Sequence, residues 1–163
     1  ASATASSATS VDFTSFITSD FDEYVLLGEY ILPATDAVDA YFRVSTNGGS
    51  SYLAGTEYTY TAVGVDTVGT SGSAGAQIRM NRVSIGNASG EGMDFEIRLT
   101  RPWGGQSVKG VRWLGNYRNT ATGTEGHMGS GLVAASSAVN AVRFLFSSGN
   151  IAQGSFKLFG VRT

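Results

Sequence analysis

Apolar and polar residues alternate with period two along much of this chain. The clearest example spans residues 139–161, where two alternating runs flank a polar tip at residues 147–150. Alternation bounded by Gly and Asn is typical of β-strands joined by a tight turn, so this stretch predicts an antiparallel hairpin. Four of its large apolar residues are expected in the protein core: Phe144, Phe146, Phe156 and Leu158.

The same pattern recurs at intervals of about ten to fifteen residues, as in all-β proteins. Further strands are expected at residues 11–17, 23–32, 38–45, 56–63, 76–85, 93–100 and 108–117. Asn47-Gly48 follows the third of these runs and predicts a second hairpin, because both residues tolerate positive φ. No segment shows convincing helical periodicity. The expected fold is therefore an all-β, antiparallel β-sandwich of about nine or ten strands, most simply a jelly roll.

Three segments interrupt this pattern. Residues 1–10 contain only Ala, Ser and Thr, so we expect a flexible arm preceding a single β-sandwich domain at residues 11–163. Residues 64–75 are rich in Gly, Ser and Thr and predict a surface loop. A second loop is expected at residues 118–131. Because the chain begins with Ala, we expect it to be processed or part of a longer protein.

Charged residues are few and unevenly distributed. Only 15% of the chain is charged, which favours a surface that is covered by partners. The first 66 residues carry nine acidic residues and one arginine, whereas the remainder carries ten basic and four acidic residues. Acidic and basic strands could pair within one sandwich, or an acidic face of one copy could meet a basic face of the next. The basic residues are scattered singly, which argues against nucleic-acid binding.

No residue pattern points to catalysis, so we expect a non-enzymatic protein without a cofactor. The chain has no cysteine and one histidine, His127, in the segment Gly126–Ser130. No nucleophile-elbow motif accompanies it, so a structural role is expected. Glu91, Asp94 and Glu96 could supply paired carboxylates, but alternation places the latter two on the solvent side of a strand.

Metal and membrane binding are equally weakly indicated. Residues 19–23, or Asp36 with Asp39, could offer oxygens to calcium, but neither resembles an EF-hand loop, so no metal site is expected. No apolar run approaches the length of about 18 residues that a membrane helix needs, so no membrane insertion is expected.

Aromatic residues suggest one further activity. Aromatic rings with polar neighbours are suited to carbohydrate binding, and the candidate glycan contacts are Trp103, Tyr52 and Tyr117. Trp103 lies in a Gly-flanked turn and is the best exposed of the three. Trp113, on a strand between Arg112 and Leu114, is expected in the core.

Two segments carry a resemblance to a known family. FDEYVLLGEYILPATDAVDAYFRVSTNGGSSY and VNAVRFLFSSGNIAQGSFKLFGV resemble a β-rich module of tailed-bacteriophage and prophage virion proteins. That module has a Pro-Ala-Thr-Asp turn, a Ser-Thr-Asp-Gly-Gly hairpin and a closing Gly-Asn-Ile motif that ends in Leu-Tyr-Gly. This chain has Asn47 in place of the Asp and Phe159 in place of the Tyr. The resemblance covers residues 11–45 and 139–162.

The resemblance implies a virion structural protein with no catalytic residues. We expect self-association, as a homotrimer, and contact with other virion proteins in capsid decoration or in a head fibre, tail fibre or spike. The alternative is a glycan-binding module that recognises a host surface receptor. The first is tested by oligomeric state and the second by glycan binding.

Overall fold

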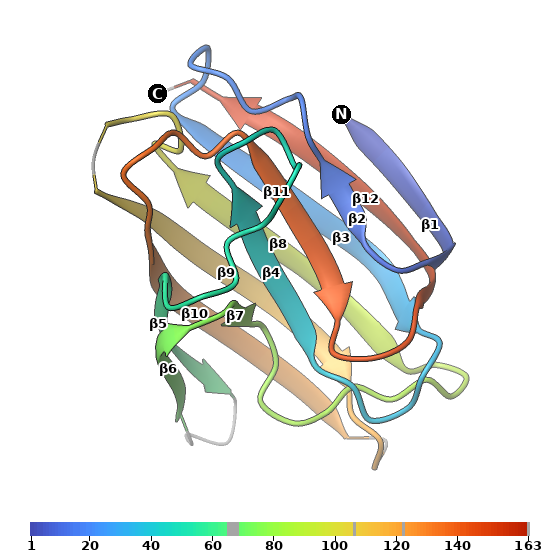
Figure 1. Cartoon of the computed structure of the whole chain (residues 1–163). Helices are drawn as coiled ribbons and strands as arrows, with labels where there is room; N and C mark the ends of the chain where they lie inside the picture. The colour runs from blue at the N-terminus through green and yellow to red at the C-terminus, as the bar shows by residue number, and fades with distance from the viewer. Residues whose placement is uncertain (65–68, 106, 122, 163) are drawn as a thin grey trace.

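The computed structural model describes residues 1–64, 69–105, 107–121 and 123–162, and every regular element within them is a β-strand. The strands form two packed antiparallel sheets, with the smaller sheet in front in Figure 1. The larger sheet has the order β1 (Ser2–Ala8), β12 (Ile151–Val161), β3 (Glu23–Pro33), β8 (Gly92–Thr100), β9 (Val108–Arg118), β10 (Thr124–Ala134), β5 (Tyr58–Gly64), β6 (Gly69–Gly75). The smaller sheet has the order β2 (Val11–Phe13), β11 (Ala141–Phe146), β4 (Ala40–Ser45), β7 (Ile78–Arg79).

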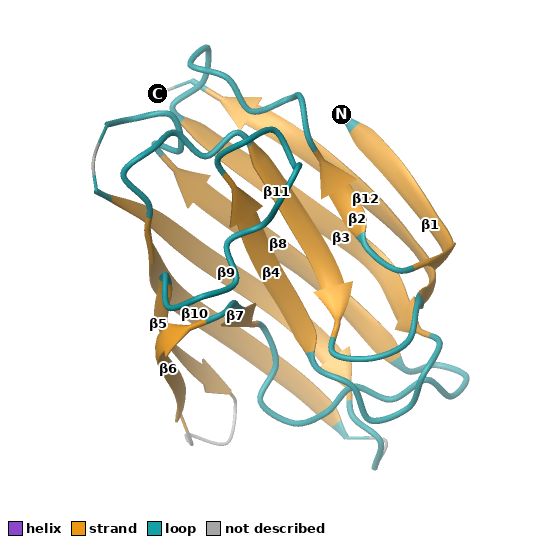
Figure 2. Cartoon of the chain, in the orientation of Figure 1, coloured by secondary structure: helices purple, strands orange, loops and turns teal. Residues whose placement is uncertain are grey.

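The strand order is that of a jelly roll. Strands β1 to β4 alternate between the two sheets, as do the pairs β7–β8 and β11–β12. They build a four-on-four sandwich, β1-β12-β3-β8 against β2-β11-β4-β7, which confirms the predicted fold. The insertions β5–β6 and β9–β10 extend the larger sheet beyond this sandwich, so that β8 is followed by β9, β10, β5 and β6 (Figure 2).

The predicted terminal hairpin is wrong. β11 pairs with β2 and β4 in the smaller sheet, whereas β12 pairs with β1 and β3 in the larger one. Residues 147–150 therefore carry the chain from one sheet to the other. Alternation identifies the inward side of each strand but does not distinguish side-by-side pairing from face-to-face packing. Here the inward rings meet across the sandwich, with the centroids of Phe144 and Phe156 5.4 Å apart.

The Asn47-Gly48 turn likewise joins strands of different sheets instead of a hairpin, since β4 and β5 do not pair. Gly48 and Gly49 do adopt positive φ, of 69° and 84°. The Asn47 side chain stabilises the turn, because its Oδ1 accepts a hydrogen bond from the Ser51 backbone N–H at 3.0 Å. The local conformation was predicted correctly, and the partner strand was not.

Three segments predicted to be irregular contain strands, which raises the number of strands in the described residues to twelve. Residues 2–8 form β1 along β12 of the same chain, with Ala5 opposite Gly154, so they are not a flexible arm. Residues 69–75 form β6 at the opposite edge, and residues 124–134 form β10. At a sheet edge few side chains need to be buried, so the small residues of β1 and β6 gave no strand signal. Residues 65–68 of the predicted loop lie outside the described residues.

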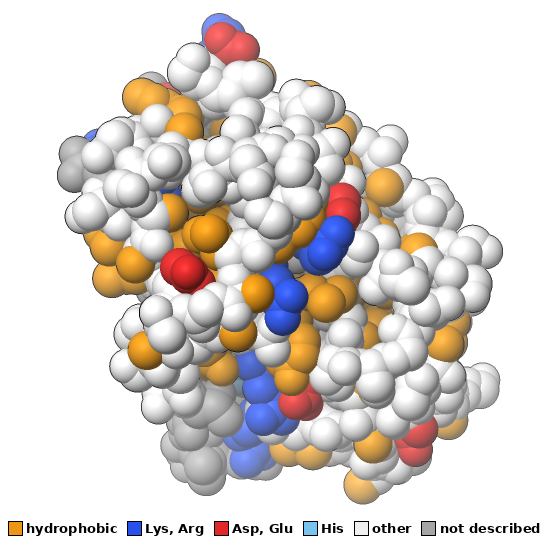
Figure 3. All heavy atoms as spheres, viewed as in Figure 1, with side chains coloured by type: hydrophobic (Ala, Val, Ile, Leu, Met, Phe, Trp, Pro, Cys, Tyr) orange, Lys and Arg blue, Asp and Glu red, His pale blue; other side chains and the backbone are white. Residues whose placement is uncertain are grey.

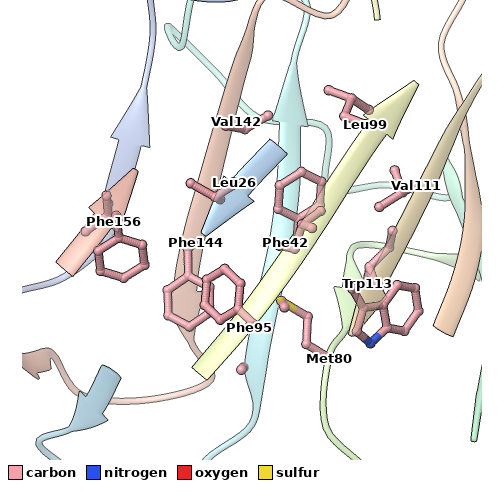
Figure 4. Close-up of a cluster of buried hydrophobic side chains, with 14 of the residues drawn as sticks. Leu26, Phe42, Met80, Phe95, Leu99, Val111, Trp113, Val142, Phe144 and Phe156 are labelled. Carbon is pink, nitrogen blue, oxygen red and sulfur yellow. The ribbon is translucent and has the colours of Figure 1, made fainter. Parts of the chain in front are cut away.

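The core lies between the sheets and is rich in aromatic rings. Figure 4 shows Phe42, Phe95, Phe144 and Phe156, from four different strands, gathered in this layer. Phe95 and Phe144 stack across the sandwich with centroids 5.0 Å apart. The four core residues expected from the terminal stretch are all buried: Phe144, Phe146, Phe156 and Leu158. Trp113 is also buried, as expected.

The uneven distribution of charge along the sequence is largely balanced by ion pairs within the folded chain. Acidic side chains of the first 66 residues form ion pairs with basic side chains of the later strands. These pairs are Asp12–Arg143 (2.6 Å), Asp39–Arg79 (2.8 Å), Glu29–Lys157 (2.8 Å) and Glu23–Arg98 (3.5 Å). The interpretation that acidic and basic strands meet within one sandwich is therefore confirmed.

Candidate functional site

The two outward faces of the sandwich differ in character. Figure 3 looks onto the smaller sheet, where basic side chains run in a line down the face. Arg43 and Arg143 are cross-strand neighbours on β4 and β11, and Arg79 lies on β7. Arg143 pairs with Asp12, Arg79 pairs with Asp39, and Arg43 donates to the Gln77 side chain at 2.9 Å. Each of these three arginines thus has a side-chain partner.

The outer face of the larger sheet, which is turned away from the smaller sheet, exposes large apolar side chains. Leu114, Met128 and Val63 occupy directly opposed positions on β9, β10 and β5. They are 58%, 55% and 44% exposed, and we call them the apolar row. A hollow of about 530 Å³ lies over this part of the sheet and is also lined by Arg112 and Ser130. Contiguous exposed apolar surface of this kind marks interaction sites.

A second hollow lies at the end of the outer face where β3 is interrupted by a β-bulge. The register of β3 against β8 shifts between Gly28 and Ile31, so that Glu29 and Tyr30 are both exposed while Ile31 is fully buried. Tyr30 has a φ of 53° and is 66% exposed. Positive φ is unfavourable for a bulky residue and is found where the surroundings enforce it.

The bulge is held by a carboxylate on the neighbouring strand. The backbone N–H of Tyr30 donates a hydrogen bond of 2.6 Å to Oδ1 of Asp94. The adjoining hollow has a volume of about 260 Å³, and we call it the Tyr30 pocket. Its lining includes the following side chains on the four strands β3, β8, β9 and β10: Tyr30, Asp94, Asn116, Arg118 and Thr124.

Polar groups with free hydrogen-bonding capacity surround this pocket. Among the described residues, the Asn116 amide and Oδ2 of Asp94 make no hydrogen bond. Arg118 donates only a long hydrogen bond, of 3.5 Å, to the Gly90 carbonyl. Glu91, in contrast, is buried and accepts a 2.6 Å hydrogen bond from the Ala88 backbone N–H. The pocket therefore offers a carboxylate, an amide and a guanidinium beside an exposed ring.

Only one of the three aromatic residues predicted from sequence to contact glycan borders this pocket. That residue is Tyr117, and its placement corrects the prediction because only 2% of its surface is exposed. Its hydroxyl accepts hydrogen bonds from the backbone N–H groups of Arg82 and Val83, at 3.1 Å and 3.0 Å. Burial raises the pKa of Tyr117, so the neutral phenol persists at physiological pH. Its ring is a core side chain with no face for a ligand.

The other two candidates lie apart from Tyr117 and from each other. Trp103, in the turn between β8 and β9, is 40% exposed, as expected, but its Nε1–H donates a 2.6 Å hydrogen bond to the Phe21 carbonyl. Tyr52, between β4 and β5, is covered by the Arg143 guanidinium, which lies 3.9 Å from the ring centroid. Burial, with the nearby Asp12 carboxylate, raises the pKa of Tyr52 to about 12. The structure does not assemble the three residues into one site.

The single histidine lies in the core. His127 is 3% exposed on the inward side of β10, and its Nδ1 accepts a hydrogen bond from Trp113 Nε1–H at 3.3 Å. Burial lowers the pKa of His127 below its usual value, and Arg79 and Arg82 act in the same direction. The imidazole is thus neutral and structural at physiological pH, although it lies in a strand and not in the predicted loop.

The candidate acidic residues occupy three different settings. Asp94 holds the bulge, Glu96 pairs with Arg98 at 2.7 Å, and Glu91 is buried in a turn. Asp94 and Glu96 lie on the solvent side of β8, as alternation predicts. Across the described ranges, no group of three or more His, Asp or Glu residues is arranged to hold a metal ion.

Tyr30 was missed from sequence because its run, EYVLLGEYIL, was expected to form one uninterrupted strand over residues 23–32. The signal that could have revealed it is the pair Glu29-Tyr30. These two adjacent residues both carry polar groups and interrupt an otherwise apolar run. Such a break in alternation is typical of a bulge.

None of the described residues lies in a helix long and apolar enough to cross a membrane.

Comparisons with known proteins do not place the chain in a family. No protein-family model matches the sequence, and no curated protein matches it as a relative.

Proposed function

We propose that this chain is a structural protein of a bacteriophage virion that assembles with copies of itself through the outer face of its larger sheet. The observation that carries the proposal is the apolar row, Val63, Leu114 and Met128, which one copy leaves uncovered. The jelly-roll order supports it, because this architecture is common in viral capsid proteins. The resemblance of the first and last strands to phage virion modules supplies the virion context.

The charges around the apolar row favour a second copy as its partner. Arg98 pairs with Glu96 at 2.7 Å and with Glu23 at 3.5 Å, and Arg112 lies 4.0 Å from Glu23. The positive charges of these two arginines are therefore balanced by acidic side chains of the same sheet. Three copies of this face can therefore pack around a common three-fold axis without strong like-charge repulsion, which would otherwise cost free energy. Leu132, on the same side of β10 and 49% exposed, extends the apolar surface.

The N-terminal segment does not supply a flexible arm to the assembly. Residues 2–8 already pair with β12 of their own chain, so they are not free to lie along a neighbour. Burial of apolar side chains on the outer face supplies the association free energy instead. We propose a homotrimer as the assembled state.

Oligomeric state in solution tests this proposal. Sedimentation velocity should give a species of three times the 17.0 kDa chain mass. The double variant Leu114→Glu/Met128→Glu should be monomeric, since two carboxylates on the apolar row cannot be buried unpaired. Ser6→Glu is the matched control, because it adds a charge at an exposed position of β1 in the same sheet. A wild-type chain that stays monomeric at high concentration contradicts the proposal.

Location on the particle tests the virion assignment separately. Mass spectrometry of purified particles should detect peptides of this chain, and immunogold labelling should place it on the capsid or on the tail. Particles that lack the chain, from cells that express it, would overturn the virion assignment whatever its oligomeric state.

A further inference from the structure

We infer that the Tyr30 pocket binds a neutral hexopyranose residue of a glycan. The inference goes beyond self-assembly and concerns a different part of the outer face. Its starting point is the bulge in β3, which directs a large aromatic side chain outward beside a small hollow of about 260 Å³. This volume is below the roughly 300–1,000 Å³ of pockets for drug-sized ligands and suits one sugar ring.

The aromatic ring is presented at a conformational cost. Tyr30 is held at a φ of 53°, where glycine would be relaxed, and its ring is not used in the core because the residue is 66% exposed. Strained residues that contribute nothing to packing are typical of binding sites. A tyrosine ring offers an apolar face to the C–H groups of a pyranose and a hydroxyl at its tip.

The polar groups around the ring match the chemistry of sugar hydroxyls. A hydroxyl donates one hydrogen bond and accepts others, so it needs both kinds of partner. Asp94 offers an unused carboxylate oxygen, Asn116 offers both a carbonyl oxygen and an N–H₂ group, and Arg118 offers donors. Because these groups lie on adjacent strands β8 and β9, with Asp94 directly opposite Asn116, their spacing is set by the sheet.

The charge of the pocket favours a neutral sugar over an acidic one. Asp94 and Glu91 line the pocket, with Arg118 as the basic residue among its lining side chains. Glu29, the neighbour of Tyr30 on the bulge, is paired with Lys157 at 2.8 Å. A carboxylate brought in by a sialic or uronic acid would add to the two carboxylates of Asp94 and Glu91, against the one guanidinium of Arg118 among the described lining residues.

The surroundings also favour a chain of sugars over a single one. Asp94 and Asn116 also line a separate hollow beside the Tyr30 pocket. This hollow has a volume of about 430 Å³ and continues along the outer face to Leu114. A residue bound at Tyr30 could therefore be followed by another over β8 and β9. The ligand class is thus a neutral oligosaccharide whose terminal or penultimate ring stacks on Tyr30.

Ligand-observed NMR with defined sugars tests the inference. The probes are the methyl glycosides of glucose, galactose and mannose and the corresponding neutral disaccharides, with sialic acid as the acidic comparison. We expect saturation transfer to at least one neutral probe and tighter binding of its disaccharide. If none of the neutral probes binds, or if only sialic acid binds, the inference is wrong.

Two variants locate the site. Tyr30→Gly removes the ring at a position where glycine is conformationally favoured, and Asn116→Ala removes an amide that makes no hydrogen bond in the described structure. Each should weaken binding about tenfold or more while the fold is retained, as judged by thermal unfolding. Trp103→Phe is the control, because Trp103 is an exposed aromatic residue outside the pocket. Loss of binding in this control alone would move the site to Trp103 and overturn the inference.

The outcome can be separated from that of the assembly proposal. The variant Val63→Glu/Met128→Glu also places two carboxylates on the apolar row but changes no residue that lines either hollow of the sugar site, so as a monomer it should still bind the sugar. A wild-type trimer that binds none of the neutral probes contradicts only the sugar site. A monomeric wild type that binds them contradicts only the assembly.

Discussion

The backbone N–H of Tyr30 donates a 2.6 Å hydrogen bond to Oδ1 of Asp94, and this contact joins the bulge of β3 to the adjacent strand β8. The Asp94 carboxylate accepts from the Tyr30 N–H, which the bulge takes out of the regular hydrogen-bond ladder between the strands. Without it, a residue at a φ of 53° would leave its N–H without a protein partner. One side chain thus fixes the geometry of the Tyr30 pocket and also lines it.

Removing this carboxylate should destabilise the fold. Asp94→Ala is expected to lower the free energy of unfolding by about 1–2 kcal/mol, because the N–H of Tyr30 loses a charged acceptor. Tyr30→Gly should leave stability unchanged or raise it by up to about 1 kcal/mol, since glycine adopts positive φ without strain. Urea denaturation measures both. Glu96→Ala is the matched control on β8. An equal loss of unfolding free energy in this variant would show that the hydrogen bond from Tyr30 to Asp94 makes no specific contribution to stability.

The N-terminal strand should behave as part of the sandwich. Ala5 is 2% exposed and faces inward from β1, whereas Ser6 is exposed. Ala5→Glu should therefore cost about 2–3 kcal/mol of stability because it places a charge against the core, and Ser6→Glu should cost little. Thermal and urea unfolding compare the two. A flexible arm would tolerate both substitutions equally, which would contradict the pairing of β1 with β12.

His127 should make stability depend on pH. Burial lowers the pKa of the folded-state imidazole below its unfolded value near 6.5, so below that pH the unfolded chain binds a proton that the folded chain does not. Stability contributed by neutral His127 is complete above pH 6.5 and is lost as the pH falls through the folded-state pKa. His127→Gln, which keeps an acceptor for Trp113, should reduce the slope of stability between pH 6.5 and that pKa. An unchanged slope would show that other groups cause it.

Gly129 should be intolerant of even one added methyl group. A Cβ at this position would lie 2.1 Å from the Trp113 ring, which is fixed in the core. Gly129→Ala is expected to cost about 1–3 kcal/mol or more through overpacking, with a change in tryptophan fluorescence. Gly105→Ala is the control, because a Cβ there meets nothing within 4 Å. Equal stability of the two variants would contradict the close packing of β9 against β10.

The candidate site was harder to predict than the fold. Sequence placed Asp94 and Glu96 on the solvent side of a strand and Trp103 in an exposed turn, and both statements hold. It selected Tyr117 and Tyr52 as ligands on residue type alone, yet one is buried and the other lies under Arg143. Tyr30 was overlooked because a bulge changes the side of the strand that a residue faces, and this change depends on a carboxylate 64 residues away.

The sequence by itself determined the fold class, the inward positions of the main strands and the core around Phe144 and Phe156. These properties are local, because period-two alternation requires only that one side of a strand be buried. Only the tertiary structure decided that β11 and β12 lie in different sheets, that residues 2–8 and 69–75 form edge strands, and that the outer face of the larger sheet exposes the apolar row. Those properties depend on which distant strands supply the hydrogen-bonding partners, and a strand's own residues do not specify its partner.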